Sequence, residues 1–562
     1  MEFAELITIP RCDRVILYQP YQPNINGTLC ITGHHLIVSS RSESQKELWL
    51  LHSNIDYIEQ KQQGMTGGTL WLKCKDLRVI KIDVIGADQF AKVVVTLEAL
   101  TNIADPTLHY PFFYQPMFTI LEDGWSAFNP ITEFAPILKG DEWRISYVNK
   151  EYKVCPSYPS AVIVPKGIED SDLVSIANFR QAGRFPVLAY RHEGGAALLR
   201  SGQPLFTQNN KRCKEDEKLL ACVLGREEKG YIIDTRTQNL AQSAKLRGGG
   251  YEGELHYPNW RRLHKPTDRR HNLLDSLTKL MDAVNDTTSG VDKWLSRLES
   301  CGWMNNIKET LYCSCLVAQC LDQEGASVLV HDVEGMDSSL QITSLSQIIL
   351  NPDCRTVRGI EALIEREWLQ GGHPFATRHA KSCYTPQTQR NNRLHSPTFL
   401  LFLDCVHQIY SQFTCSFEFS ENFLVFLFEN SYSSQFGTFF GDNEADREKF
   451  GVTKNTTSLW SYVNRPDVLH QYLNPMYEPN QRVIWPSVAP MSLQVWNAVF
   501  LRWTVDQTPS ITAAQVTKEL RQKDSELRSK VLKLRRNLHE LEREALSLGI
   551  LSAPSPDQIS IA

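Results

Sequence analysis

The sequence predicts a multidomain α+β chain, with a small N-terminal β-barrel capped by a helix, a large α/β domain and a C-terminal coiled coil. Three observations predict this order. Segments with the period-two alternation of strands fill the N-terminal region. A buried strand, a glycine-containing loop and a helix follow one another farther along, and leucine recurs every seven residues near the end. We therefore place the domains at 1–101, 108–505 and 512–550, followed by a tail at 551–562.

The N-terminal region changes from strand-like to helical periodicity once. The stretches that predict strands are 27–38, with a turn in its middle, 48–51, 68–74 and 77–84. Over 87–100 the apolar residues Phe90, Val93, Val94 and Leu97 instead share one face of a helix. A run of antiparallel strands closed by one C-terminal helix predicts a small barrel with a helical cap.

Charge and composition exclude several classes of protein. The chain has 59 Lys plus Arg against 64 Asp plus Glu, a formal net charge of −5, which argues against a chain-wide nucleic-acid binder. Hydrophobic residues make up 42% and charged residues 22%, as in ordinary globular proteins, so wholesale disorder is excluded. The most apolar stretch, 397–410, contains Asp404 and His407 and is too short for a membrane helix. We expect no signal peptide, because no positive and then apolar segment opens the chain.

The cysteines predict a cytosolic protein without a metal site. The 14 cysteines are scattered, form no Cys-x2-Cys pair, and lack a histidine pair at zinc-finger spacing. Reduced, mostly buried thiols fit this pattern better than a disulfide framework does. The chain also lacks a phosphate-binding Gly-x4-Gly-Lys-Ser/Thr loop, a His-Glu-x2-His helix and a Gly-x-Ser-x-Gly elbow, and we expect no cofactor.

The centre of the large domain predicts an anion-binding turn. Residues 326–331 form a continuous apolar run ending in histidine, as expected of a strand buried on both faces. Residues 338–350 have helical spacing, and 332–337 lie between the two. A strand, a tight loop and a helix start can hold an anion, because free backbone N–H groups point out of the helix N-terminus.

The same residues carry a resemblance to a known family. The nine residues from His331 to Ser339, His-Asp-Val-Glu-Gly-Met-Asp-Ser-Ser, lie where the myotubularin phosphoinositide 3-phosphatases have His-Cys-Ser-Asp-Gly-Trp-Asp-Arg-Thr. The family's spacing also fits 183–186, 200–204, 215–219, 248–252, 355–359, 363–369 and 372–375. The N-terminal region resembles the PH-GRAM module of these proteins. The resemblance implies a degenerate cysteine-phosphatase-like domain from a catalytically inactive branch of the family.

The chemistry of the loop agrees with that implication. A cysteine-based phosphatase needs a thiolate nucleophile and an arginine that binds the phosphoryl oxygens. Asp332 stands at the nucleophile position and Ser338 at the arginine position. We expect Glu334 and Asp337, on either side of Gly335, to add two carboxylates to a cup meant for an anion. Each would repel phosphate at ~4 Å by about 1 kcal/mol in water, and by about 4 at an effective dielectric near 20.

One enzymatic alternative remains open at this point. Asp332, at a strand end, is the residue that a weak lipid phosphatase would use as its nucleophile, as in haloacid-dehalogenase-type enzymes. That chemistry calls for a second aspartate two residues later and a magnesium site, and this chain has Glu334 there.

The C-terminal segment predicts a partner-binding helix. Its seam consists of leucine at every seventh residue and apolar residues between: Leu520, Leu527, Val531, Leu534, Leu538, Leu541, Ala545 and Leu548. The flanking charged positions are Arg521, Lys523, Arg528, Lys530, Arg535, Glu542 and Glu544. A parallel homodimer would set Lys523 against Arg528 and Lys530 against Arg535, and like charges select against it. A partner with acidic flanks, or an antiparallel self-dimer, removes the conflict.

Together these observations predict a pseudophosphatase adaptor. The resemblance implies that the coiled coil pairs with active myotubularin-related phosphatases and regulates their activity, stability or location. Self-association, and weak contact with phosphoinositide membranes, stay open. Residues 1–101 carry ten basic and eleven acidic side chains, so they show no basic excess for anionic lipid. We expect a cytoplasmic protein peripherally associated with endomembranes, at the endosome or the endoplasmic reticulum.

Overall fold

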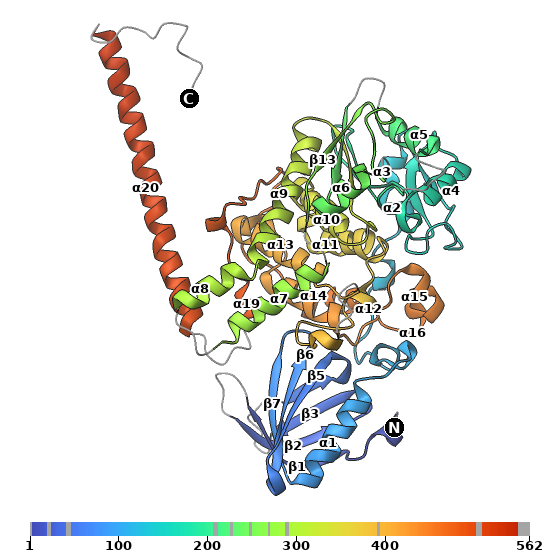
Figure 1. The fold of residues 1–562 in the computed structure, drawn as a ribbon, viewed down its shortest axis with the longest axis vertical. Coiled ribbons are helices and arrows are strands. Elements are labelled where there is room, and N and C mark those ends of the chain that lie inside the picture. Colours follow the sequence, from blue (N-terminus) through green and yellow to red (C-terminus); the bar gives the residue numbers. More distant parts are fainter. Residues whose placement is uncertain are drawn as a thin grey trace.

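The structure is a computed structural model, and it shows a sheet domain, a large α/β domain and a projecting helix (Figure 1). It describes residues 3–18, 24–40, 47–205, 212–224, 229–246, 250–267, 270–286, 291–389, 394–501 and 508–548. The predicted tail at 551–562 lies outside the described residues. Among the described helices, none combines the length and apolar character needed to cross a bilayer.

The N-terminal domain is a seven-stranded antiparallel sheet with one long helix. Its strands are β1 (Arg11–Tyr18), β2 (Ile25–Ile31), β3 (His35–Ser40), β4 (Leu48–Leu51), β5 (Ile55–Gln62), β6 (Gly67–Cys74) and β7 (Val79–Ile85). Helix α1 (Ala87–Leu100) follows, and the predicted apolar face of this helix is buried in the domain core. The pairing order puts β4 and β5 at opposite ends of the sheet, so the closed barrel that we predicted is an open sheet over the described residues.

The large domain is built around a five-stranded mixed sheet in the order β10-β11-β14-β12-β13. These strands are β10 (Val187–Arg191), β11 (Ala197–Ser201), β12 (Gly230–Asp234), β13 (Trp260–His264) and β14 (Ser327–His331), and a separate pair is β8 (Trp143–Ser146) with β9 (Val162–Pro165). All neighbours are parallel except β10 and β11. Strand β14 is therefore central, and each of its residues is buried, as the continuous apolar run predicts.

Helices cover both faces of this sheet. Val328 and Val330 of β14 belong to one hydrophobic core and Leu329 to another, because successive side chains of a strand point to opposite faces. On the face of Leu329 lie α2 (Pro130–Glu133), α3 (Ala135–Leu138), α4 (Asp170–Phe179) and α5 (Lys214–Val223), and α6 (Gln238–Leu246) follows β12. On the other lie α7 (Arg270–Val284), α8 (Val291–Ser300), α9 (Trp303–Asp322), α10 (Ser338–Leu350), α11 (Val357–Leu363) and α13 (Thr398–Gln412).

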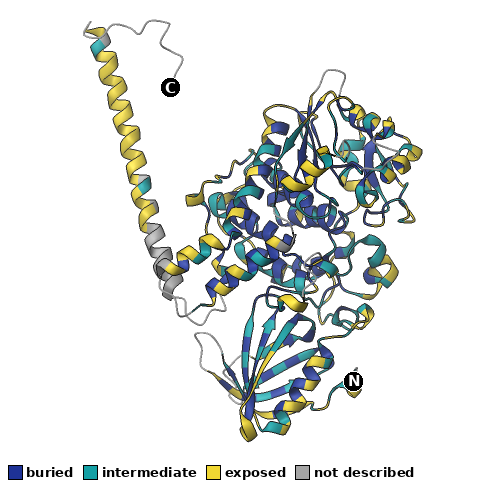
Figure 2. Cartoon of the chain, in the orientation of Figure 1, coloured by how far each residue is buried: buried dark blue, intermediate teal, exposed yellow. Residues whose placement is uncertain are grey.

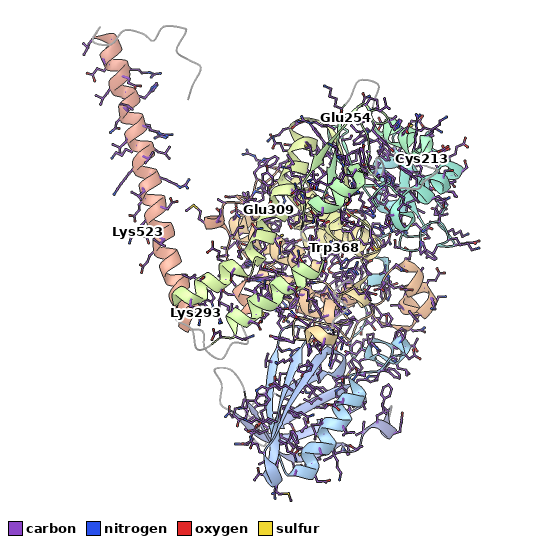
Figure 3. All side chains as sticks on the ribbon, viewed as in Figure 1. Cys213, Glu254, Lys293, Glu309, Trp368 and Lys523 are labelled. Carbon is purple, nitrogen blue, oxygen red and sulfur yellow. The ribbon has the colours of Figure 1, made fainter. Side chains whose placement is uncertain are left out.

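The rest of the large domain is helical and packs around fully buried aromatic side chains. Its elements are α12 (Phe375–Arg378), α14 (Glu421–Tyr432), α15 (Glu444–Phe450), α16 (Val452–Asn455), α17 (Leu459–Val463), α18 (Pro466–Leu469) and α19 (Asn497–Phe500). Trp368, labelled in Figure 3, lies in a π-helical segment after α11 and packs against Phe399 and Phe402. The apolar stretch at 397–410 is thus part of buried α13.

The C-terminal segment is one helix, α20 (Thr508–Ser547), which stands apart from the large domain along most of its length (Figure 1). Its helical conformation is as predicted. The pairing of two such helices into a coiled coil stays a prediction.

Candidate functional site

The loop between β14 and α10 lies at the carboxyl end of the central strand, where α/β sheets bind their ligands. Gly335 turns the loop with φ of 76°, a conformation that side chains with a Cβ rarely adopt. A Cβ at this position would also lie 2.5 Å from the carbonyl oxygen of Ser201 on β11. Glycine is therefore required here, and the loop keeps the shape of an anion cradle.

The carboxylate of Asp332 occupies that cradle. One oxygen accepts the backbone N–H of Gly335. The other accepts the N–H groups of Asp337 and Ser339, each at 3.3 Å, and the hydroxyls of Ser338 and Ser339, each at 3.2 Å. The Asp332 side chain is buried, so these donors are satisfied inside the protein. The anion bound by this loop is therefore the carboxylate of Asp332, a residue of the loop itself.

The other two acidic residues of the loop lie near one guanidinium, that of Arg378. Asp337 forms a bidentate pair with Arg378 of α12, at 2.9 Å for both bonds, and accepts the hydroxyl of Thr398 at 3.3 Å. Glu334 is about one-third exposed, and its carboxylate lies 3.8 Å from the same guanidinium. We expected three carboxylates to crowd the cup. This expectation is wrong for Asp337, because Arg378 from a distant segment neutralises it.

Ser338 does not replace the arginine whose position it takes. Its hydroxyl is shared between Asp332 and Thr235 of the neighbouring strand connection, at 2.8 Å from the latter. The segment from His331 to Ser339 contains neither cysteine nor arginine. Without a thiolate and a guanidinium facing the cup, the described loop lacks the groups for phosphoryl transfer to sulfur.

Arg184 holds the loop from below. Its guanidinium donates to the carbonyl oxygens of Gly335 at 2.6 Å and Gly371 at 2.8 Å, and to the hydroxyl of Ser157 at 2.8 Å. It stacks over the Tyr158 ring at 4.3 Å, and burial lowers its pKa. This arginine therefore fixes the loop backbone instead of binding a ligand. Sequence reasoning singled out the segment around Arg184 by resemblance only, and it missed Arg378, whose neighbours have no periodic or motif signal.

A buried charge network forms the floor beneath the loop. Arg180 pairs with Asp216 through two bonds of 2.7 and 2.8 Å and with Glu252 at 2.6 Å, and all three side chains are fully buried. The other Glu252 oxygen lies 3.3 Å from Nε2 of His331, the last residue of β14. Burial alone would raise the pKa of Glu252, but His331 and Arg180 lower it well below its usual value. The network ties the strand end to two segments that are far away in the sequence.

The predicted partner-binding residues are exposed along α20 (Figure 2). The exposed fractions of the seam side chains, Leu520, Leu527, Val531, Leu534, Leu538, Leu541 and Leu548, run from 48 to 65%. Figure 3 shows side chains, with Lys523 labelled, extending outward from this helix. Within the helix Arg528 pairs with Asp524 at 2.8 Å. A row of exposed leucines on a helix this long is unusual for a monomer, because burial of each one would be favourable.

Comparisons with known proteins agree on both folded domains. The model for the myotubularin-like phosphatase domain matches residues 109–448, and the model for the MTMR6-9 GRAM domain matches residues 11–101. The chain is 55% identical to Myotubularin-related protein 9 of Bos taurus over 546 residues, 97% of this chain and 99% of that protein. For the Homo sapiens protein of the same name the identity is 54%, with the same coverage. At 32% identity over 553 residues, the chain also matches the Homo sapiens Phosphatidylinositol-3,5-bisphosphate 3-phosphatase MTMR8, covering 96% of this chain and 76% of that protein.

Proposed function

The chain belongs to the myotubularin-related family, and from that premise we propose that it is a catalytically inactive member that serves as an adaptor. In this proposal it pairs through α20 with an active phosphoinositide 3-phosphatase of the family and regulates the activity, stability or location of that enzyme. The observation that carries the proposal is the Asp332 carboxylate, which stands at the nucleophile position and accepts the hydrogen bonds of the phosphate-binding loop.

Two features of the loop argue against the alternative, a weak lipid phosphatase that uses Asp332 as nucleophile. An attacking carboxylate must turn an oxygen toward the phosphorus atom, and hydrogen bonds from the loop hold both Asp332 oxygens in place. A phosphoryl group entering the cup would compete with Asp332 for the same N–H groups. Arg378, which lies near Glu334 and Asp337, is already paired with Asp337.

Phosphate release separates the two functions. We expect the purified protein to release phosphate from phosphatidylinositol 3-phosphate and the 3,5-bisphosphate no faster than its Asp332→Ala variant does. An active relative, such as MTMR8, provides the positive control. Turnover that is present in the purified chain and abolished by Asp332→Ala would establish the enzyme and overturn the adaptor as its main role.

The exposed seam of α20 supports the pairing part of the proposal. Coiled-coil partners bury leucines that recur every seven residues, and here those leucines are left exposed in the single chain. Lys523, Arg528, Lys530 and Arg535 flank the first part of the seam, so a parallel helix with acidic flanking residues is the complementary partner. Asp524, seven residues before Val531, occupies a seam position between Leu520 and Leu527, and its intrahelical pair with Arg528 lowers the cost of an acidic residue there.

Pairing is tested with the full chain and a purified active relative. We expect the full chain and MTMR8 to form a complex in analytical ultracentrifugation, and a chain that ends near Trp503 to form none. The complex should change the rate at which MTMR8 releases phosphate. Complex formation that persists without α20 would place the contact elsewhere, and a tight parallel homodimer indifferent to MTMR8 would replace the adaptor by a self-assembling protein.

The N-terminal domain supports peripheral contact with endomembranes in this proposal, through its membership of the GRAM family. The near balance of basic and acidic residues in 1–101 makes weak affinity for phosphoinositides the expectation. Flotation of the purified chain with vesicles that contain phosphatidylinositol 3-phosphate, compared with neutral vesicles, measures that affinity.

A further inference from the structure

A cavity lies where the N-terminal domain meets the large domain. Its volume is about 590 Å³, within the range of about 300–1,000 Å³ typical of small-molecule sites. The N-terminal domain contributes Lys75 and residues around His52, the connecting segment contributes 101–104, and the large domain contributes residues near α12 and the end of α14. In Figure 1 these two helices lie directly above the ends of β5 and β6.

The walls of this cavity are joined by hydrogen bonds between the domains. Ser53 and Ser433, which both line the cavity, share a hydrogen bond of 2.8 Å between their hydroxyls. Nearby, the Asp56 carboxylate accepts the N–H and the hydroxyl of Ser382, at 3.1 and 2.6 Å, and the hydroxyl of Thr385 at 2.7 Å. The junction is therefore a built surface with defined walls, and a molecule in the cavity would touch both domains at once.

Lys75 is the cation of this cavity. Within the described part of the chain, its ammonium makes no hydrogen bond or ion pair. Burial lowers its pKa, Asp56 raises it and Lys381 lowers it further. Asp56 attracts the ammonium, but one of its oxygens accepts the Ser382 and Thr385 hydroxyls and the other lies 3.8 Å from Lys381, so the carboxylate is shared with a second lysine. A partly buried ammonium without a carboxylate in direct contact is costly, and an anion placed beside it would be favourable.

Three histidines of the lining do not supply a second cation. Burial lowers the pKa of His52 to about 4 and that of His379 to about 3, and it also lowers the pKa of His109, so these side chains are neutral at physiological pH. Two carboxylates also line the cavity. Asp442 accepts the N–H and hydroxyl of Thr377, at 2.8 and 2.5 Å, and Asp446 accepts the N–H of Asp442 at 3.3 Å. They are engaged within the large domain and limit the ligand to a single negative charge.

Much of the remaining wall is aromatic. The rings of Phe375, Phe439 and Phe440 line the large-domain side, and Tyr110 lines the side of the connecting segment. Such a wall favours an apolar body. We propose that this cavity binds a small amphipathic anion, whose carboxylate, sulfonate or phosphodiester group pairs with Lys75 while its apolar or aromatic part lies against Phe375, Phe439 and Phe440. Occupancy stabilises the arrangement of the two domains, because the ligand contacts both.

The test uses 8-anilinonaphthalene-1-sulfonate as the probe and the full chain as the protein. We expect one saturable site in a fluorescence titration, and about ten- to a hundredfold weaker binding in Lys75→Gln, since a charge-assisted hydrogen bond is lost. Lys61→Gln, which changes an exposed lysine on β5, is the matched control and should bind as the unmodified chain does. Ala104→Trp, at an exposed residue of the lining, fills the cavity and should weaken binding without disturbing the fold.

Competition identifies the ligand class. Decanoate should displace the probe, whereas inorganic phosphate at the same concentration should not, because it lacks an apolar body. Equal binding by Lys75→Gln and the unmodified chain, or unchanged binding by Ala104→Trp, would overturn the site. Displacement by inorganic phosphate as effective as that by decanoate would overturn the amphipathic class. If Lys75→Gln lost affinity for phosphatidic-acid vesicles but kept the probe, the lysine would serve a membrane surface, which also overturns the proposal.

Discussion

The central loop and the C-terminal helix differ in whether their potential binding groups already have partners within the chain. In the loop, the N–H groups that could hold a phosphate are bonded to Asp332, and the charges beneath them are paired and fully buried. On α20, by contrast, the leucines of the seam are about half exposed or more. A site whose groups are satisfied internally has little free energy left to give a ligand, whereas an uncovered apolar stripe gains free energy by burial. This difference is the reason that we propose partner binding by the helix and not by the loop.

The largest expected effect tests how much the buried charge network beneath the loop contributes to the stability of the fold. Arg180→Met removes the cation that pairs with Asp216 and Glu252, leaving two buried carboxylates without it. We expect the free energy of unfolding to fall by about 3–5 kcal/mol, measured by urea denaturation followed by tryptophan fluorescence.

Arg11→Met is the control for this change. Arg11 pairs with Asp13 on the surface of the N-terminal domain, so its removal should leave unfolding unchanged. If Arg180→Met unfolded at the same urea concentration as the unmodified chain, the buried network would not support the loop.

The second effect tests whether the leucine seam of α20 contacts a partner. Leu534→Glu places a charge in the seam, where a partner helix would bury it, and should weaken binding to an active relative about a hundredfold, or about 2.7 kcal/mol. The matched control is Leu532→Glu, because Leu532 is 60% exposed in the single chain and Leu534 is 65% exposed, but Leu532 lies off the seam. Binding measured by calorimetry should be nearly unchanged in the control. Equal losses in both variants would mean that the seam does not define the contact.

The third prediction tests whether the Asp332 carboxylate alone keeps other anions from binding to the N–H groups of the loop. Asp332→Ala leaves buried N–H groups without an acceptor and should lower stability by about 1–3 kcal/mol. Added inorganic phosphate or vanadate should then raise the melting temperature of the variant but not that of the unmodified chain. Glu334→Gln, which changes a partly exposed carboxylate, should do neither. A rise in both proteins would show that the cradle accepts an anion beside Asp332.

The smallest effect is the pH dependence of stability that Glu252, in the buried charge network beneath the loop, contributes. The pKa of Glu252 is lowered well below 4.5 in the folded chain, so its ionised form contributes stability above about pH 4.5, and that contribution is lost as the pH falls. Between pH 5 and pH 3 the unmodified chain should therefore lose up to about 1.4 kcal/mol per pH unit from this group. Glu252→Gln should flatten that part of the curve. An unchanged acid slope in the variant would assign the loss to other carboxyl groups.

Periodicity made several elements predictable from the sequence. The strand at 327–331, the helix at 338–350 and the helix at 87–100 all appear where their apolar spacing predicts them. Apolar spacing predicts these elements because each of them buries one face or both, and that requirement does not depend on which elements pack against it. The N-terminal barrel was predicted less well, since strand pairing at the two ends of a sheet depends on contacts that no local pattern contains.

The sequence by itself determined that the loop has lost its thiol and its arginine and that the last helix carries a seam of leucines. Only the tertiary structure decided that Asp332 fills the cradle, that Arg378 neutralises Asp337, and that the two folded domains enclose a cavity beside Lys75. The physical reason is that composition and spacing report which groups a segment carries. Hydrogen bonds and ion pairs between residues far apart in the chain depend on how the backbone brings their atoms together, and this is a property of the whole fold.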